Sequence, residues 1–175
     1  MRTEVLFEER GSWAWWVHLL IWFCCAVCFF SVQGSVSGAL RGEADAMPLG
    51  TAILIICLGL AFPLLFYSLM GQLRTRVTEE GVLVVWGMAE VIKKRVPFEE
   101  IEGVEAVTYS PLGEFGGWGI RMGSKKKRAW TVSGNQAVRL DLREGIKLYV
   151  GSQHPARLGE RIRSGWSTFK GRSAS

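Results

Sequence analysis

Residues 12–32 read SWAWWVHLLIWFCCAVCFFSV, and residues 49–70 read LGTAILIICLGLAFPLLFYSLM. Neither stretch contains a side chain that is formally charged at neutral pH. A helix rises about 1.5 Å per residue, so about 20 apolar residues are enough to cross the ~30 Å hydrocarbon core of a bilayer. Both stretches therefore predict transmembrane helices, preceded by an N-terminal tail, residues 1–11, and joined by a loop, residues 33–48.

A cleaved signal peptide is the competing interpretation of the first stretch. Such a peptide has an apolar core of about 7–15 residues behind a basic leader. The apolar run here is longer, and the segment before it carries the acidic residues Glu4, Glu8 and Glu9. We therefore favour a retained membrane helix.

The basic residues are distributed unevenly along the chain. Residues 71–175 hold 18 of the 21 Lys and Arg residues and 11 of the 16 Asp and Glu residues, a net charge of +7, whereas the loop 33–48 holds only Arg41. Because basic segments stay on the cytoplasmic side of a membrane, we expect a multi-pass protein of a plasma membrane with both termini in the cytoplasm. The cytoplasmic end of the first helix carries aromatic residues expected to anchor it at the membrane interface: Trp13, Trp15 and Trp16.

Few residues inside the apolar stretches have side chains that could react, bind a metal or transfer a proton. All four cysteines lie there: Cys24, Cys25, Cys28 and Cys57. A thiolate is poorly supported in hydrocarbon without a cationic neighbour, so we favour packing residues over a metal or redox pair. His18 lies near the cytoplasmic end of the first helix, where a proton relay or a haem ligand is one interpretation. We favour the other, a neutral hydrogen bond from His18 to the second helix.

After Gly71 the sequence changes to short alternating runs, which predict strands of half-buried sheets. A hairpin is predicted from residues 74–78 and 82–86, across the turn Glu79-Glu80-Gly81. A single helical turn is expected at residues 97–101. Further strands are expected at residues 90–96, 102–109, 120–122, 129–132, 137–142 and 146–150.

The last predicted element is an amphipathic helix. Pro155 suits its first turn, and apolar residues then recur at helical spacing: Leu158, Ile162, Trp166 and Phe169. About seven antiparallel strands followed by one such helix, all within residues 71–169, is the plan of a pleckstrin-homology-like (PH-like) barrel. Residues 170–175 would form a tail.

Four segments carry a resemblance to a known group of proteins. They are VPFEEI at 96–101, GWGIR at 117–121, TVSGNQAV at 131–138 and VGSQHPARL at 150–158. The chain resembles uncharacterised bacterial membrane proteins that have two transmembrane helices before a bacterial PH-like domain. The resemblance implies a membrane α-helical hairpin and a mainly β domain with a PH-like antiparallel barrel, in a bacterial plasma membrane. It implies no catalytic residue.

The densest charge of the chain is the run Lys125, Lys126, Lys127 and Arg128. Close to an anionic leaflet, each such residue contributes about 1 kcal/mol of attraction. With three arginines of the last helix, Arg157, Arg161 and Arg163, this run forms a candidate contact with anionic membrane lipids. A solvated hairpin tip is the equally weighted alternative. Glu79 and Glu80 on the first hairpin argue against a phosphoinositide site there, and a nucleic acid partner is not expected beside a competing membrane.

Catalysis is not indicated. The glycine-rich stretch 113–123 lacks the Lys-Ser/Thr ending of a P-loop and is expected to form a barrel corner. The single histidine of the β-rich part, His154, precedes Pro155 at the helix start, where it suits a turn or cap better than catalysis. We therefore expect no enzyme, no metal and no cofactor.

The leading hypothesis is a non-catalytic, membrane-anchored module that binds a protein partner. The binding surface would be the barrel edge, the loops at residues 113–127 or the terminal helix. Two alternatives stay open. One is an anionic-lipid-sensing module, and the other is an accessory subunit of a larger membrane complex, which would dock through aromatic residues of the helices: Trp22, Phe29, Phe30 and Phe66.

Overall fold

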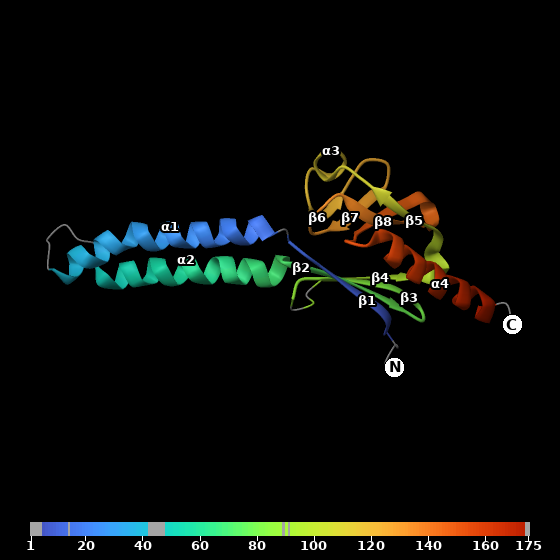
Figure 1. Ribbon diagram of the computed structural model, residues 1–175, viewed down its shortest axis with the longest axis horizontal. Coiled ribbons are helices and arrows are strands. Elements are labelled where there is room, and N and C mark those ends of the chain that lie inside the picture. The colour runs from blue at the N-terminus through green and yellow to red at the C-terminus, as the bar shows by residue number, and fades with distance from the viewer. Residues whose placement is uncertain (1–4, 14, 42–47, 89, 91, 174–175) are drawn as a thin grey trace. The chain divides into compact units, whose positions relative to one another are not determined.

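The computed structural model describes residues 5–13, 15–41, 48–88, 90 and 92–173. It divides the chain into two compact units (Figure 1). One unit is helical and comprises Ala14–Leu69. The other is β-rich and combines Met1–Trp13 with Met70–Ser175. The N-terminal segment therefore belongs to the same unit as the C-terminal part of the chain.

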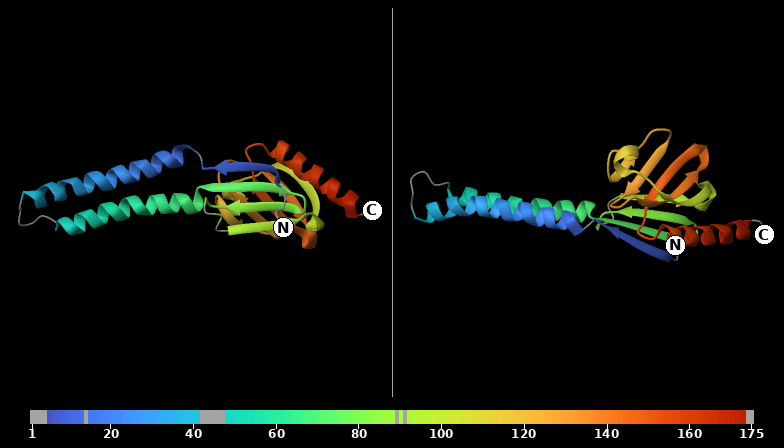
Figure 2. Two further views of the ribbon diagram at one scale, coloured as in Figure 1. Left: turned by 90° about the horizontal axis from the view of Figure 1, so that it is seen from below. Right: turned by 45° about the horizontal axis from the view of Figure 1, so that its top comes forward.

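The helical unit consists of α1, Trp15–Leu40, and α2, Leu49–Met70. The two helices run side by side in every view (Figures 1 and 2). The window Val17–Gly34 of α1 has a mean hydropathy of 1.9 and is only 7% buried, so it is long and apolar enough to cross a membrane. The corresponding apolar stretch of α2, Ile53–Leu65, is shorter. Among the described residues α1 alone contains a window of that length, and the second crossing stays a prediction.

The helix α1 begins and ends later than the predicted helix 12–32. Its C-terminal part extends through residues 33–40, which were expected to belong to the loop. No proline and no charged residue interrupts these residues, so the helical backbone continues. Of the predicted loop, residues 42–47 lie outside the described residues.

The β-rich unit contains two sheets. Sheet A is antiparallel with the order β1-β2-β3-β4: β1 Val5–Ser12, β2 Gln72–Thr78, β3 Gly81–Trp86 and β4 Ile92–Pro97. Sheet B has the order β5-β8-β9-β7-β6: β5 Ile101–Thr108, β6 Gly119–Met122, β7 Lys127–Thr131, β8 Gln136–Leu142 and β9 Ile146–Gly151. The remaining elements are helical: η1 Phe98–Glu100, α3 Pro111–Phe115, η2 Arg143–Gly145 and α4 Pro155–Ser173.

The strand count and pairing differ from the prediction of about seven antiparallel strands. The described residues form nine strands, and β7 pairs with β9 in parallel. One edge of β8 pairs with β5 and the other pairs with β9. The strand β7 therefore pairs with the free edge of β9, and these two strands are parallel. The predicted hairpin of β2 and β3, the helical turn η1 and the helix α4 are all present. The helix α4 continues into residues 170–173, which were predicted to be a tail.

The main hydrophobic core is formed by one face of each sheet and by α4. Leu73 of β2 and Leu148 of β9 are almost fully buried, and so are Leu158 and Ile162 of α4. Trp166 and Phe169 pack against the same core, so the four apolar residues predicted on this helix face are confirmed. Because α4 contacts β2 and β3 of sheet A and also β5 and β8 of sheet B, it closes the space between the sheets (Figure 2).

The strand β1 was not predicted, since residues 1–11 were expected to be a tail. It pairs with β2 from Ser12 opposite Gln72 to Val5 opposite Thr78. Its Phe7 side chain packs against the main core. Charged residues make up much of β1, so its alternation of apolar and polar residues is weak. Its partner strand β2 also lies far along the sequence, after both helices.

The carboxylate of Glu9, in β1, also forms hydrogen bonds at the start of α4. Oε1 of Glu9 accepts hydrogen bonds from the backbone N–H groups of Gln153 at 2.9 Å and His154 at 3.3 Å. The Ser152 hydroxyl donates to the same oxygen at 2.8 Å. The first turn of α4 contains no acidic residue of its own. Glu9 therefore supplies the negative charge that stabilises a helix N-terminus by about 0.3–1 kcal/mol.

A glycine of α4 provides a test of this packing. A Cβ atom added at Gly165 would lie 2.8 Å from Cζ of the buried Phe98. We expect Gly165→Ala to lower the free energy of unfolding by up to about 2 kcal/mol. Overpacking a core costs about 1–3 kcal/mol, and the ~1 kcal/mol by which Ala exceeds Gly in helix propensity offsets part of this cost. The measurement is denaturant unfolding of the full chain in detergent, followed by tryptophan fluorescence.

The matched control is Gly159→Ala in the same helix. Its Cβ would meet side-chain atoms of Arg163 and Val138 at the ordinary contact distances of 3.8 and 4.0 Å. This variant should be neutral or up to about 1 kcal/mol more stable than the parent chain. Equal effects of the two substitutions would contradict the described packing of α4 on Phe98.

Candidate functional site

Exposed apolar side chains lie along the edge strand β6. Ile120 and Met122 are 38% and 84% exposed, and Trp118, just before the strand, is 37% exposed. Successive alternate residues of a strand share a face, so Ile120 and Met122 point to the same side of sheet B. We refer to Trp118, Ile120 and Met122 as the β6 edge. Exposed apolar groups of this kind mark surfaces that contact other proteins.

The backbone of the β6 edge is also available for pairing. Gly123 N–H donates to the Lys127 carbonyl at 2.8 Å, so residue 123 faces β7. Orientation alternates along an antiparallel pair, and therefore the N–H and C=O groups of Ile120 and Met122 point away from β7. Among the described strands, β6 pairs with β7 alone. An extended segment could hydrogen-bond to this edge.

The other edge strands are protected against such pairing. The strand β4 carries Lys93, Lys94 and Arg95 in succession, and charged edge residues oppose the addition of another strand. The strand β1 carries Glu8, Glu9 and Arg10. The edge strand β5 of sheet B is in contact with α4. Exposed apolar residues also occur on β1 and β4, at Val5, Leu6 and Ile92. Among the described edge strands, β6 combines apolar side chains with outward-facing backbone groups and carries no run of charged residues.

The basic run at residues 125–128 covers the end of the β6–β7 turn and the first two residues of β7, and it does not form one free patch. Lys126 Nζ donates to the Glu144 carbonyl at 2.8 Å. Lys127 Nζ forms a 2.5 Å ion pair with Glu114 and lies over the Tyr149 ring. Lys125 and Arg128 are exposed. The fold therefore directs two of these four cations to partners within the β-rich unit.

The three arginines of α4 make different contacts. The guanidinium groups of Arg157 and Arg161 lie 5.6 and 5.9 Å from the centre of the Phe7 ring. Arg163 donates to the Val104 carbonyl at 3.2 Å. These arginines thus pack on β1 and β5, whereas Lys126 and Lys127 contact η2 and α3. The structure does not show the two sets in contact with a common element.

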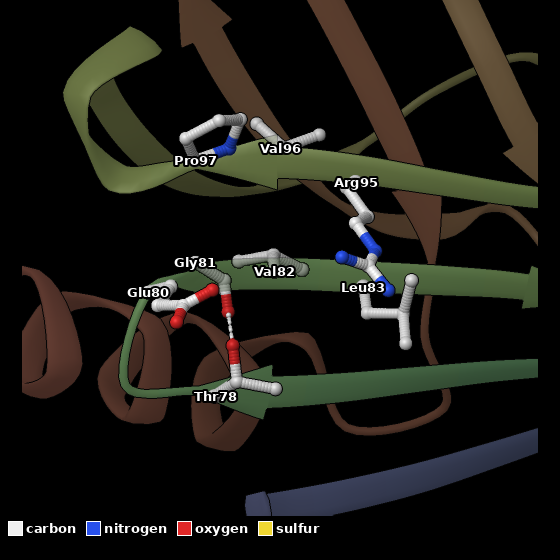
Figure 3. Close-up of a pocket in the computed structure, with 8 residues that line it drawn as sticks. All are labelled: Thr78, Glu80, Gly81, Val82, Leu83, Arg95, Val96 and Pro97. Carbon is white, nitrogen blue, oxygen red and sulfur yellow. Dashed lines mark hydrogen bonds between the residues drawn. The ribbon is translucent and has the colours of Figure 1, made fainter. Parts of the chain in front are cut away.

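Two adjoining hollows lie beside the basic run, and each has a volume of about 290 Å³. They share Arg128, Glu144 and Ile146. Cations and carboxylates both line the first hollow: Lys94, Glu100, Arg128, Arg143 and Glu144. A third hollow of about 110 Å³ lies at the β2–β3 turn, where the Thr78 hydroxyl donates to the Gly81 carbonyl at 2.9 Å (Figure 3). None of the described lining residues is a histidine or cysteine that could act as a base or nucleophile.

The described residues contain no group of three or more His, Cys, Asp or Glu side chains that could hold a metal ion. Cys24, Cys25 and Cys57 are free. The side chain of Cys28 lies outside the described residues.

The aromatic residues near the start of α1 have different surroundings. Trp13 is partly buried against the core of the β-rich unit. The role predicted for Trp13, Trp15 and Trp16 at a membrane interface stays a prediction. Trp15 is exposed. The side chain of Trp16 lies outside the described residues. Within the helical unit, His18 Nε2 lies 3.2 Å from the Tyr67 hydroxyl, and the two rings meet edge to face.

A network of charges that the sequence analysis missed lies on sheet A. Glu8 of β1 pairs with Arg10 at 2.7 Å and with Arg76 at 2.9 Å. Hydrogen bonds from Arg10 and then Arg76 lower the pKa of Glu8, and the bond to Glu8 raises the pKa of Arg76. Bonds from Lys93 and then Arg76 lower the pKa of Glu90. The Glu8–Arg76 pair connects residues 68 positions apart in the sequence, so no local motif signals it.

Comparison with known proteins identifies no family for this chain. No protein-family model and no curated protein matches the chain. The function has to be inferred from the chain's own residues.

The Glu114–Lys127 pair generates a pH-dependent prediction. The hydrogen bond from Lys127 lowers the pKa of Glu114, and the bond to Glu114 raises the pKa of Lys127. The pair therefore contributes stability above about pH 4 and below about pH 10, and loses it as either group becomes neutral. We expect Glu114→Gln to reduce stability by up to about 1 kcal/mol at pH 7. The measurement is the unfolding free energy between pH 3 and 8.

The loss in Glu114→Gln should shrink as the pH falls below about 4, because Glu114 is then protonated in the parent chain as well. A suitable control is Glu102→Gln on β5, whose carboxylate forms no ion pair with the described residues. A pH-independent loss in Glu114→Gln would show that the ion pair is not its cause.

Proposed function

We propose that the chain is a non-catalytic, membrane-anchored module whose β-rich domain binds a protein partner through the β6 edge. The observation that carries this proposal is the exposure of Ile120 and Met122 on a strand whose backbone also faces outward. A partner would add an extended segment to sheet B, with main-chain hydrogen bonds for affinity and apolar contacts for specificity. Confinement to a membrane raises the effective concentration of such partners, so a weak contact suffices.

Membrane anchoring is supported by the exposed apolar surface of α1 and by the pairing of β1 with β2. The strand β1 precedes α1, and β2 follows α2. Two paired strands lie on one side of a bilayer, because an open sheet with unpaired edges is not stable in hydrocarbon. The chain would therefore cross the membrane an even number of times, which favours a helical hairpin. Cleavage of α1 as a signal peptide would also remove β1, with Phe7 and Glu9.

The remaining parts of the proposal follow from charge and fold plan. The basic excess of residues 71–175 favours a cytoplasmic β-rich domain. The resemblance given above implies a bacterial plasma membrane. Two sheets around one core, closed by a C-terminal helix, support a PH-like fold. The added strand β1 and the parallel β7–β9 pair are departures from a simple PH-like barrel.

The binding surface can be tested by charge. In the double variant Ile120→Glu with Met122→Glu, a partner that binds the β6 edge has to bury two carboxylates, which is costly. We expect the amount of partner that co-purifies with the full chain in mild detergent to fall at least tenfold. The matched control is Ile92→Glu, which alters an apolar residue 41% exposed on the edge strand β4. A partner retained by both variants, or lost from both, would contradict the assignment of the β6 edge.

The topology can be tested by labelling. In a background without native cysteines, Ser37→Cys should react with an impermeant maleimide in intact cells, because this residue lies beyond the apolar window of α1. Ser124→Cys, at the exposed turn between β6 and β7, should react only after lysis. The opposite pattern would place the β-rich domain, and with it the partner, on the other side of the membrane.

A further inference from the structure

Sheet A presents a basic face that points away from the core. In β2, Leu73, Thr75 and Val77 are buried, so Arg74 and Arg76 between them point outward. The strand register aligns the outward residues in two rows across the sheet. One row is Arg10, Arg74, Val85 and Lys93, and the other is Glu8, Arg76, Leu83 and Arg95.

The cations of this face exceed its carboxylates. Glu8 is shared by Arg10 and Arg76. Glu90 is shared by Arg74, Arg76 and Lys93 at 3.5, 2.9 and 2.9 Å. A fifth cation, Arg95, lies with its guanidinium group beside Leu83 (Figure 3) and forms no ion pair with the described residues. Five cations thus face two carboxylates, which leaves a local charge of +3.

Arg74 lies at the centre of this face with a donor to spare. Its side chain is only 17% exposed, and its Nε is buried without a hydrogen-bond partner. Its Nη2 makes one long hydrogen bond, 3.4 Å, to Gln72. Buried polar groups are normally paired, and an unpaired guanidinium N–H is well suited to a phosphate oxygen. On either side across the strands lie the more exposed cations Arg10 and Lys93.

The chain itself limits how far this row lies from the ends of the helices. Arg74 follows the last residue of α2, Met70, by four residues, and four extended residues span at most about 14 Å. Arg10 precedes Trp15, the first residue of α1, by five residues, which span at most about 18 Å. The row is therefore within reach of the headgroup layer of any membrane that the helices cross.

We propose that the outer face of sheet A binds the phosphate group of an anionic lipid headgroup, with Arg10, Arg74 and Lys93 as donors. The proposal rests on the membrane anchoring proposed above and does not depend on protein binding at the β6 edge. It differs from the lipid contact expected from the sequence, because Lys125–Arg128 and the arginines of α4 lie on other elements. Glu8 and Glu90 do not neutralise all five cations of this face, and an anionic headgroup would compensate the remaining positive charge.

The experiment uses the full chain, purified in a neutral detergent. It is titrated with dioctanoyl phosphatidylglycerol, with dioctanoyl phosphatidylcholine and with inorganic phosphate, and the bound ligand is counted by native mass spectrometry. We expect phosphatidylglycerol to bind at least tenfold more tightly than either of the other ligands. Equal binding of the two lipids would overturn the proposal. Phosphate that binds as tightly as phosphatidylglycerol would identify a soluble phosphate compound as the ligand instead.

The variants locate the site. Arg10→Gln with Lys93→Gln changes side chains that are 67% and 49% exposed, so the fold should be retained, as an unchanged unfolding temperature would verify. Each cation removed should weaken phosphatidylglycerol binding by about fivefold, giving about 25-fold for the pair. Arg74→Gln should cost at least as much as either single change. Retained affinity in these variants would overturn the proposal.

The matched control is Lys125→Gln with Arg128→Gln, which removes the same charge from the β6–β7 turn and the start of β7. We expect it to change the affinity by less than twofold, and a loss equal to that of the sheet variant would show that only net charge matters. Membrane fractionation of the parent chain separates the two proposals. A chain absent from the membrane fraction would contradict anchoring, whereas a membrane-bound chain without phosphatidylglycerol preference would contradict the lipid site alone.

Discussion

The pairing of β1 with β2 is the constraint on which the rest of the structure depends. These strands enclose the two helices in the sequence, and Ser12 lies opposite Gln72 where the chain leaves and re-enters sheet A. The pairing holds Phe7 against the main core and brings Glu9 to the residues just before α4. The N-terminal segment is therefore a structural part of the β-rich unit, and the helical hairpin is an insertion between two neighbouring strands.

This insertion leaves little room for a flexible linker. Gly71 is the only residue between α2 and β2, and two residues separate β1 from α1. A domain on a long Gly/Ser-rich linker samples a large volume, whereas a domain joined at two adjacent strands stays close to its anchor. For the proposed function, this short connection limits the partners of the β6 edge to those near the membrane. For the proposed lipid site, the same short connection keeps Arg10 and Arg74 within five residues of the helix ends.

The parts of the fold that the sequence predicted are those set by local patterns. The β2–β3 hairpin follows from alternation around a Gly-containing turn, and the buried face of α4 follows from helical spacing. The strand β1 and the parallel β7–β9 pair depend on partners distant in sequence, so no local pattern shows them. The same holds for the Glu8–Arg76 pair. Lys125–Arg128 looked like one patch because they are contiguous, but Glu114 and the Glu144 carbonyl engage two of them.

The edge strands β4 and β6 differ in charge, and this difference affects what each strand can bind. Both strands are short and both end a sheet. On β4 the run Lys93-Lys94-Arg95 opposes strand addition, and two of these cations also contribute to the basic face of sheet A. On β6 only Arg121 is charged, and the outward backbone groups belong to apolar residues. An approaching peptide strand is therefore disfavoured at β4, whereas β6 carries no such run of charge. In the two proposals made above, the cations of β4 separate a protein-binding edge from a lipid-facing sheet.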